Sequence, residues 1–283
     1  MTSVSPVTRR AVARQKVHHY LTSFCSRMLR WFRAYSLSLI FIVSLGGVWQ
    51  LVATISGLQS YILPKPSSII YAAVASDRSV LLANAQTTLF EIVVGFVLAV
   101  ASGFLVAVLL ASNRMIRSAI YPVVVSSQTI PTLAIAPLLV IWFGFGPLPK
   151  VLVVAVFGFF PVAVRTLRGI ESVEDDTIRL MRSLGAGRWA TFIGVRLPAA
   201  LPTAFSGVRL AAVYAPIGAI TGEWVGAQNG LGPLMINANS TLDTALVFAA
   251  ILYLTVIAIA LVLTVSVVEH YAIPWYFLVR SEA

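Results

Sequence analysis

The chain has 283 residues, of which 59% are hydrophobic and 11% are charged, and its formal net charge is +10. A soluble domain carries about a quarter charged residues and could not bury this much apolar surface, so lipid must cover the rest. The basic residues lie in loops between apolar runs, which fits membrane topology better than the nucleic-acid binding that the charge alone would suggest.

The residues with reactive or metal-binding side chains are few. The single cysteine, Cys25, and the histidines His18, His19 and His270 provide neither a disulfide framework nor a Cys/His cluster. The chain also lacks the G-x-x-x-x-G-K-[ST] phosphate-binding loop of ATPases. We therefore predict no catalytic residue, no metal site and no cofactor bound by this chain.

Six apolar runs approach the roughly 20 residues that a transmembrane helix needs. These runs are residues 36–55, 92–111, 118–145, 148–164, 197–222 and 244–268. The fold class predicted is all-α transmembrane with six helices. The domains expected are a basic cytoplasmic tail at 1–35, a membrane domain at 36–270 that contains a long loop at 165–198, and a short cytoplasmic tail at 271–283.

The start of the chain is not typical of a cleaved signal peptide, because its basic segment and first apolar run are too long and no A-x-A site follows. If the N-terminus is cytoplasmic, nearly all arginines fall on the cytoplasmic side, and the opposite side receives only Lys65, Arg78 and Lys150. The positive-inside rule then places both termini in the cytoplasm.

The third apolar run contains Pro122, Pro131 and Pro137. In lipid every freed backbone group needs a partner, so these prolines predict a helix that is broken or wrapped by its neighbours. A kinked packing helix and a pathway-lining element are both compatible with this pattern.

The long loop at 165–196 predicts two short amphipathic helices. Ser172 and Asp175 have capping-box spacing at the start of the first helix, and Gly185 suits its C-terminal cap. The apolar residues of this helix, three apart, are Ile178, Met181 and Leu184. Those of the second helix are Trp189, Phe192 and Val195, and we expect Pro198 and Pro202 to end it and to begin the next span.

Two amphipathic helices in a loop have two interpretations. They could lie on lipid headgroups, held by arginines, or they could bind in a groove of another protein. Periodicity alone slightly favours the lipid surface.

The sequence motifs alter that balance. Gly185, Val195, Leu197 and Pro198 have the spacing G, nine residues, an aliphatic residue, one residue, L-P. This resembles the loop signature of ABC importer permeases, E-A-A, three residues, G, nine residues, I-x-L-P. The stretches that resemble the sulfonate, taurine, nitrate and thiamine-precursor branch of that family are, in order, "LPKPSSI" (63–69), "IPTLAIAPLLVIWFGFG" (130–146), "FFPVAVRTLRG" (159–169), "MRSLGAGRWATFIGVRLPAALP" (181–202) and "GEWVGAQNGLGPLM" (222–235).

The resemblance implies a homodimer of six-helix, type I-like subunits in the bacterial inner membrane. Separate ABC ATPase subunits would bind ATP and magnesium, and an extracytoplasmic solute-binding protein would deliver the cargo. The loop would contain the coupling helix that docks on the ATPase. Its candidate coupling residues are Arg179, Leu180, Met181, Ser183, Leu184, Gly185, Ala186, Trp189, Val195, Leu197 and Pro198.

The chain departs from the family pattern where E-A-A is expected, because it reads Arg179, Leu180, Met181. The reversed charge leaves docking plausible and places the salt bridge to the ATPase in doubt. Glu174, Asp175 and Asp176 could replace the missing glutamate, or they could simply form an acidic first turn that suits the helix dipole.

Charged groups at membrane depth usually face a protein interior or water, and the candidates are Glu91, Arg209, Glu223 and Asp243. The candidate substrate pathway consists of Glu91, Tyr214, Glu223 and Trp224. Both glutamates are expected near the outer ends of spans, so a position in the headgroup zone is the alternative. Tyr214 and Pro216 could mark a local break of the fifth span.

Two acidic groups near an entrance disfavour an anionic cargo by like-charge repulsion. The stretches "TLFEIVVGF" (88–96) and "GEWVGA" (222–227) also look more like permeases for pyrimidine thiamine precursors or riboflavin than like sulfonate permeases. A pyrimidine precursor or a similar heterocycle is therefore the favoured cargo, and sulfonate, taurine or nitrate is the alternative. A stand-alone secondary transporter and a membrane scaffold without cargo are the competing classes.

Overall fold

The computed structural model describes residue 37 and residues 40–276, and every regular element in that part of the chain is helical. The chain divides into two compact units, Met1–Ser67 and Ser68–Ala283. In the first unit, residues Ile40–Ile55 form an apolar helix, and the Gln50 side-chain oxygen accepts a hydrogen bond from the Ser67 N–H at 3.1 Å. The predicted tail at 1–35 and residues 277–283 of the predicted C-terminal tail lie outside the described residues.

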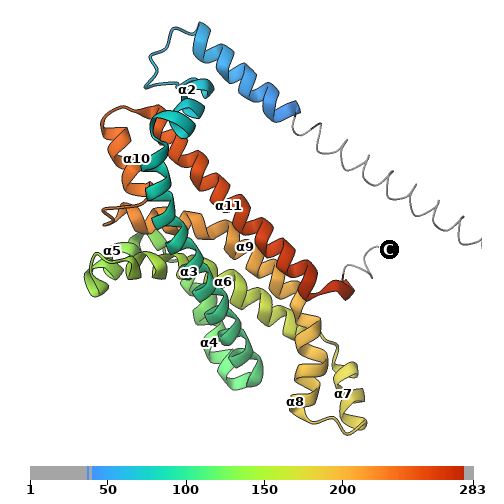
Figure 1. Ribbon diagram of the computed structural model, residues 1–283. Coiled ribbons are helices and arrows are strands. Elements are labelled where there is room, and N and C mark those ends of the chain that lie inside the picture. The colour runs from blue at the N-terminus through green and yellow to red at the C-terminus, as the bar shows by residue number, and fades with distance from the viewer. Residues whose placement is uncertain (1–36, 38–39, 277–283) are drawn as a thin grey trace, which may run out of the picture. The chain divides into compact units, whose positions relative to one another are not determined.

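The helices that follow alternate between long apolar spans and short connecting elements (Figure 1). In chain order they are α2 (Pro66–Tyr71), the π-helical turn η1 (Ala72–Ser76), α3 (Arg78–Ser112), α4 (Arg114–Ser127), α5 (Thr132–Phe143), α6 (Pro147–Glu171), α7 (Asp175–Ser183), α8 (Arg188–Thr191), the π-helical turn η2 (Phe192–Arg196), α9 (Leu197–Trp224), α10 (Leu231–Ser240) and α11 (Thr244–Ala272).

The second unit is built around α6, which packs most extensively against α9 and α3. Small residues let these helices approach closely. A Cβ atom on Gly158 of α6 would lie 2.7 Å from Ala99 Cβ of α3, and one on Gly207 of α9 would lie 2.6 Å from the Pro161 carbonyl oxygen. Helices in lipid associate through packing of this kind, because lipid tails remove the hydrophobic drive between them.

Four helices in the described residues are long and apolar enough to cross a membrane: α3, α6, the continuous helix Arg188–Trp224, and α11. Treating the bent pair α4–α5 as one span gives five. The helix Ile40–Ile55, at the position of the predicted first span, is shorter than these. The count of six spans and the cytoplasmic position of both termini stay predictions.

The predicted break in the third run is confirmed. The helix axis turns by 100° between α4 and α5, and Pro131 occupies the N-cap position of α5. Pro122 and Pro137 lie inside α4 and α5 without ending either helix. A role for this bent segment in lining a pathway stays a prediction.

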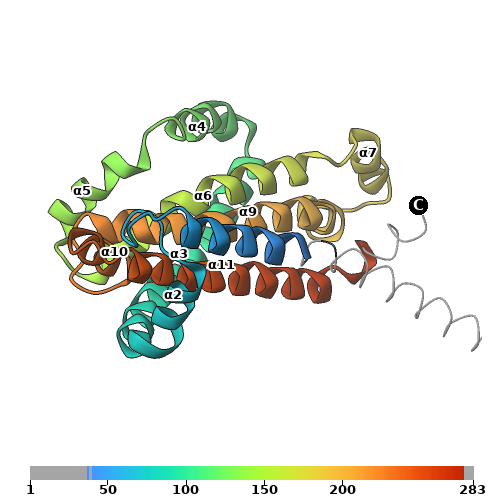
Figure 2. The same cartoon turned by 90° about the horizontal axis from the view of Figure 1, so that it is seen from above.

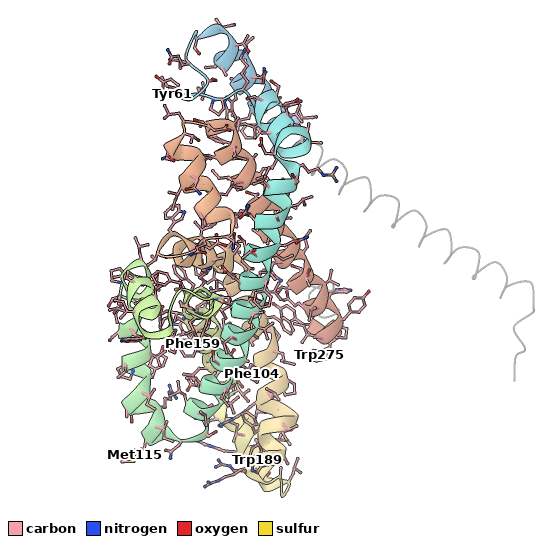
Figure 3. All side chains as sticks on the ribbon, turned by 60° about the vertical axis from the view of Figure 1, so that its left-hand side comes forward. Tyr61, Phe104, Met115, Phe159, Trp189 and Trp275 are labelled. Atoms are coloured by element: carbon pink, nitrogen blue, oxygen red, sulfur yellow. The ribbon has the colours of Figure 1, made fainter. Side chains whose placement is uncertain are left out.

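The short elements gather at two opposite ends of the second unit. Figure 1 shows α7 and α8 at one end, here called the loop end, and α10 at the other, and Figure 2 shows α7 and α10 at these same opposite ends. Met115, at the start of α4, lies toward the loop end with Trp189 of α8 (Figure 3). The junction of α3 and α4 therefore shares this end with the long loop.

Candidate functional site

The first helix of the loop, α7, begins at Asp175 with Glu174 in the N-cap position. The predicted capping box at Ser172 is wrong, because the Ser172 hydroxyl donates to the Gly169 carbonyl at 2.8 Å and belongs to the end of α6. Asp175 and Asp176 occupy the first turn of α7, where negative charge suits the helix dipole.

The C-terminal cap predicted at Gly185 is confirmed. Gly185 has a φ of +84°, a conformation that glycine adopts without a steric penalty. Its N–H donates to the Arg182 carbonyl at 3.0 Å, and the Ala186 N–H donates to the Met181 carbonyl at 3.0 Å. These two bonds form a Schellman motif, which fixes the direction in which the chain leaves α7.

The second predicted helix does not end at the prolines. Helix α8, the turn η2 and α9 form one continuous helix from Arg188 to Trp224. The Leu197 N–H donates to the Phe192 carbonyl five residues earlier, and Pro198 follows in the first turn of α9. Local π-helical adjustments of this kind let a membrane helix accommodate a proline, so the prediction that Pro198 and Pro202 stop a separate helix is wrong.

The loop exposes large apolar side chains. Leu184 is 74% exposed and Trp189 is 75% exposed, and Leu180 is also exposed, whereas Ile178 is buried. The expected single apolar face of α7 is therefore only partly right, since Leu184 lies at the C-cap beyond the last turn. Exposed apolar groups on a polar loop are typical of a surface that meets another protein.

Among the described residues, the reversed charge at the E-A-A position has one weak ion-pair partner. Arg179 lies 3.7 Å from Asp176, and both side chains are strongly exposed. Exposed pairs of this kind contribute between about 0 and 1 kcal/mol. Arg179 is therefore available to a carboxylate on another molecule.

A second polar site lies inside the helix bundle, away from the loop. Glu91 of α3 has no exposed surface, and one of its carboxylate oxygens lies 3.2 Å from the Lys150 Nζ of α6. Lys150 is itself buried. Glu91 lies inside α3, which begins at Arg78, and its predicted position near the outer end of a span stays a prediction.

Glu223, near the C-terminus of α9, is also buried and accepts two short hydrogen bonds. Its Oε1 accepts from the Thr88 hydroxyl at 2.6 Å, and its Oε2 accepts from the Gly232 N–H at 2.6 Å. The Thr88 Oγ1 in turn accepts from the Leu231 N–H at 2.9 Å, while the Asn84 Oδ1 accepts from the Gly230 N–H at 2.9 Å. The site therefore ties α3 and α9 to the start of α10.

Both glutamates are buried by protein, so neither side chain is exposed to lipid headgroups in this subunit. Of the predicted pathway residues, Glu91 and Glu223 lie close enough to interact with each other and with Lys150. Trp224, which follows Glu223 in the chain, is half exposed, and Tyr214 is partly exposed. The predicted break at Tyr214 and Pro216 is wrong, since α9 runs through both.

The partners Lys150 and Thr88 were not identified in the sequence. Sequence reasoning counts Lys150 only as a charge on the side opposite the cytoplasm, whereas it belongs to the first turn of α6 and is buried. One signal was present, because Asn84, Thr88 and Glu91 recur four and three residues apart, which places three polar groups on one face of α3.

The other two charged candidates, Arg209 and Asp243, have partners within the described part of the chain. Arg209 forms an ion pair with Glu269 of α11, which sequence reasoning did not pair with it. The Asp243 side chain accepts a hydrogen bond from the Leu246 N–H at 3.1 Å and caps α11. Both residues thus have structural roles within the chain.

The fold, the loop and the buried polar site can be compared with known proteins. Residues 95–275 match the family described as binding-protein-dependent transport system inner membrane component. The chain belongs to this family. It is accordingly a permease subunit of an ABC importer and a multi-pass protein of the inner membrane, and the stand-alone secondary transporter is set aside.

Curated permeases resemble this permease over most of their length. A probable ABC transporter permease protein of Haemophilus influenzae is 38% identical, covering 79% of this chain and 91% of its own. The formylaminopyrimidine transport permease protein ThiX of Halalkalibacterium halodurans is 34% identical, with 83% and 94% covered. The taurine transport system permease protein TauC of Escherichia coli is 30% identical, with 89% and 95% covered.

Proposed function

We propose that the loop at 165–198 transmits ATP hydrolysis on a separate ATPase subunit to the membrane helices of this permease. The observation that carries the proposal is the exposure of Leu180, Leu184 and Trp189 on short helices whose exit is fixed by the Gly185 cap. Because η2 joins α8 directly to α9, a displacement of the docked loop passes into a membrane span without an intervening flexible linker.

The machinery that follows from this role has three kinds of protein component. Two copies of this permease form the membrane pathway, and ATPase subunits bind ATP and magnesium. An extracytoplasmic solute-binding protein delivers the cargo. In this arrangement the chain itself is not an enzyme.

The exposed side chains provide a direct test of docking. Leu184→Asp combined with Trp189→Ala removes apolar surface from the loop, and we expect the ATPase to be lost when the tagged permease is purified in mild detergent. The matched control is Leu242→Asp, since Leu242 is 60% exposed and lies at the end of α10. If the loop variant retains its ATPase as fully as the control does, the proposed docking surface is wrong.

The cargo proposed is a pyrimidine thiamine precursor or a similar heterocycle. The support comes from the stretches at 88–96 and 222–227 and from the 34% identity to a formylaminopyrimidine permease. Sulfonate or taurine is the alternative, supported by the 30% identity to a taurine permease. The repulsion argument against anions is weaker than the sequence suggested, because Lys150 offsets the charge of Glu91.

Uptake into proteoliposomes that contain the permease, its ATPase and its binding protein separates the two cargoes. We expect labelled formylaminopyrimidine to accumulate with ATP, and excess taurine to leave that uptake unchanged. Accumulation of taurine without accumulation of the pyrimidine would replace the proposed cargo with the alternative while leaving the coupling role intact.

A further inference from the structure

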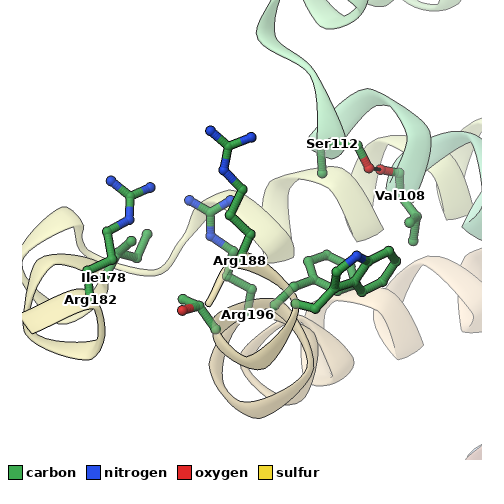
Figure 4. Close-up of a pocket in the computed structure, with 10 residues that line it drawn as sticks. Val108, Ser112, Ile178, Arg182, Arg188 and Arg196 are labelled. Carbon is green, nitrogen blue, oxygen red and sulfur yellow. Dashed lines mark hydrogen bonds between the residues drawn. The ribbon is translucent and has the colours of Figure 1, made fainter. Parts of the chain in front are cut away.

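A cavity of about 450 Å³ opens at the loop end, between the last turns of α3 and the helices of the loop (Figure 4). This volume lies in the range of small-molecule sites. Its walls carry two kinds of side chain. The polar and aromatic residues on which the argument depends are Ser112, Arg182, Arg188, Trp189, Phe192 and Arg196.

The cavity is strongly cationic. Arg182, Arg188 and Arg196 line it, and no acidic residue does. Between residues 40 and 276, none of these arginines forms an ion pair, and the buried Nε atom of Arg196 has no hydrogen-bond partner. Figure 4 shows the guanidinium groups of Arg182 and Arg188 extending to the same side of the loop.

Three arginines that line one cavity and have no ion-pair partner among the described residues favour the binding of an anion. A buried donor without a partner is unfavourable, so a ligand that accepts a hydrogen bond from the Arg196 Nε stabilises the site. Guanidinium groups present planar pairs of donors that match phosphate oxygens, and bonds between two charged groups are roughly twice as strong as neutral ones. Three unpaired guanidinium groups around one cavity therefore fit a phosphate group.

The opposite wall indicates where the phosphate comes from. Val108, Ala111 and Ser112 belong to the last turn of α3, which is a membrane-spanning helix that ends at Ser112. The aromatic rings of Trp189 and Phe192 also line the cavity, and tryptophan is common at the membrane interface. Basic pockets between membrane helices on the cytoplasmic side are typical sites for anionic lipid headgroups.

We propose that this cavity binds the phosphate group of an anionic phospholipid headgroup from the predicted cytoplasmic leaflet. The lipid joins the end of α3 to α7 and α8, and it thereby fixes the loop against the membrane surface. The proposal depends on neither the cargo nor the ATPase. It also combines the two interpretations of the loop, because the cavity meets lipid while Leu180 and Leu184, which do not line it, remain exposed.

The test measures lipid binding directly, by native mass spectrometry of the purified permease titrated with phosphatidylglycerol or phosphatidylcholine. Arg188→Gln combined with Arg196→Gln should weaken phosphatidylglycerol binding by tenfold or more and leave phosphatidylcholine binding unchanged. The matched control is Arg168→Gln combined with Arg179→Gln, which removes the same charge from exposed positions that do not line the cavity. We expect the control to bind phosphatidylglycerol within about threefold of wild type, since exposed charges contribute little.

A second variant covers the case in which the arginine variant does not fold. Ala111→Phe leaves every arginine in place and fills the cavity from the α3 side, so it should also reduce phosphatidylglycerol binding. Thermal unfolding in lipid-free detergent confirms that each variant is folded.

Three results would overturn the proposal. Equal losses in the arginine variant and its control would show general surface electrostatics rather than a site. Displacement of phosphatidylglycerol by millimolar inorganic phosphate would identify a soluble anion as the ligand. Unchanged lipid binding together with loss of the ATPase would assign the cavity to a protein interface.

Discussion

The buried Glu91–Lys150 pair predicts that removing one partner harms the permease more than removing both. Lys150→Met leaves the Glu91 carboxylate buried, with no exposed surface and without its cation at 3.2 Å. Glu91→Gln removes the carboxylate that lies within ion-pair distance of the buried Lys150 ammonium and leaves it only the electrostatic interaction with Glu223. The double variant, Glu91→Gln with Lys150→Met, removes both charges of the pair, and the nearby Glu223 carboxylate keeps its hydrogen bonds from Thr88 and Gly232.

The size of the effect follows from the burial of both groups. Loss of one partner of a buried pair costs about 3–5 kcal/mol, whereas replacing both partners with groups of similar volume is often neutral. We therefore expect each single variant to lose about 3–5 kcal/mol of unfolding free energy and the double variant to lose less than either. The exposed pair Arg117–Glu171 is the control, and Arg117→Met should cost about 1 kcal/mol or less.

Reversible unfolding in mixed micelles, followed by circular dichroism, measures these differences. The reasoning fails if Lys150→Met is as stable as wild type, because the buried carboxylate would then not need its cation. It also fails if the double variant loses the sum of the two single losses, since the groups would then act independently.

Three further predictions concern hydrogen bonding, packing and the loop. Thr88→Val removes the hydroxyl that bonds both Glu223 and the Leu231 N–H at the start of α10. The unfolding free energy should fall by about 1–3 kcal/mol, and hydrogen exchange in α10 should be faster. Unchanged exchange would show that these bonds do not hold α10 in place. Gly158→Val would place a Cβ 2.7 Å from the Ala99 Cβ of α3 and should lower the unfolding free energy by about 1–3 kcal/mol. An unchanged midpoint of thermal unfolding would contradict this close packing of α6 on α3. Gly185→Val should lower the unfolding free energy by about 1–3 kcal/mol and reduce ATPase binding. The control Gly144→Val, at a position with a similar φ of +80°, should lose as much stability and retain the ATPase. Equal ATPase retention in the two variants would contradict the role of the Gly185 cap.

Features with a local cause could be predicted from the sequence. The break near Pro131 and the cap at Gly185 follow from the backbone limits of those two residues. The apolar cores of the long helices follow from their composition. In each case the signal lies within a few residues of the structural feature.

Features that depend on distant partners could not be predicted in this way. Lys150 lies far from Glu91 in sequence, so nothing near either residue indicates that packing of α3 on α6 brings them together. Ser172 shows the opposite error. Its capping-box spacing is correct, but its hydroxyl donates a hydrogen bond to the Gly169 carbonyl at the end of α6 instead of capping α7. At Pro198 the local rule failed since a π-helical turn absorbed the proline.

The central claim is that the exposed loop of this permease docks on an ATPase. Site-specific photo-cross-linking tests it most directly, with Leu184→Cys in a Cys25→Ser background labelled by a benzophenone maleimide in native membranes, and Leu242→Cys as the matched position at the end of α10. The account predicts an adduct from position 184 that mass spectrometry identifies as an ABC ATPase, and no such adduct from position 242. Absence of the ATPase at 184, or equal cross-linking at both positions, would contradict the claim.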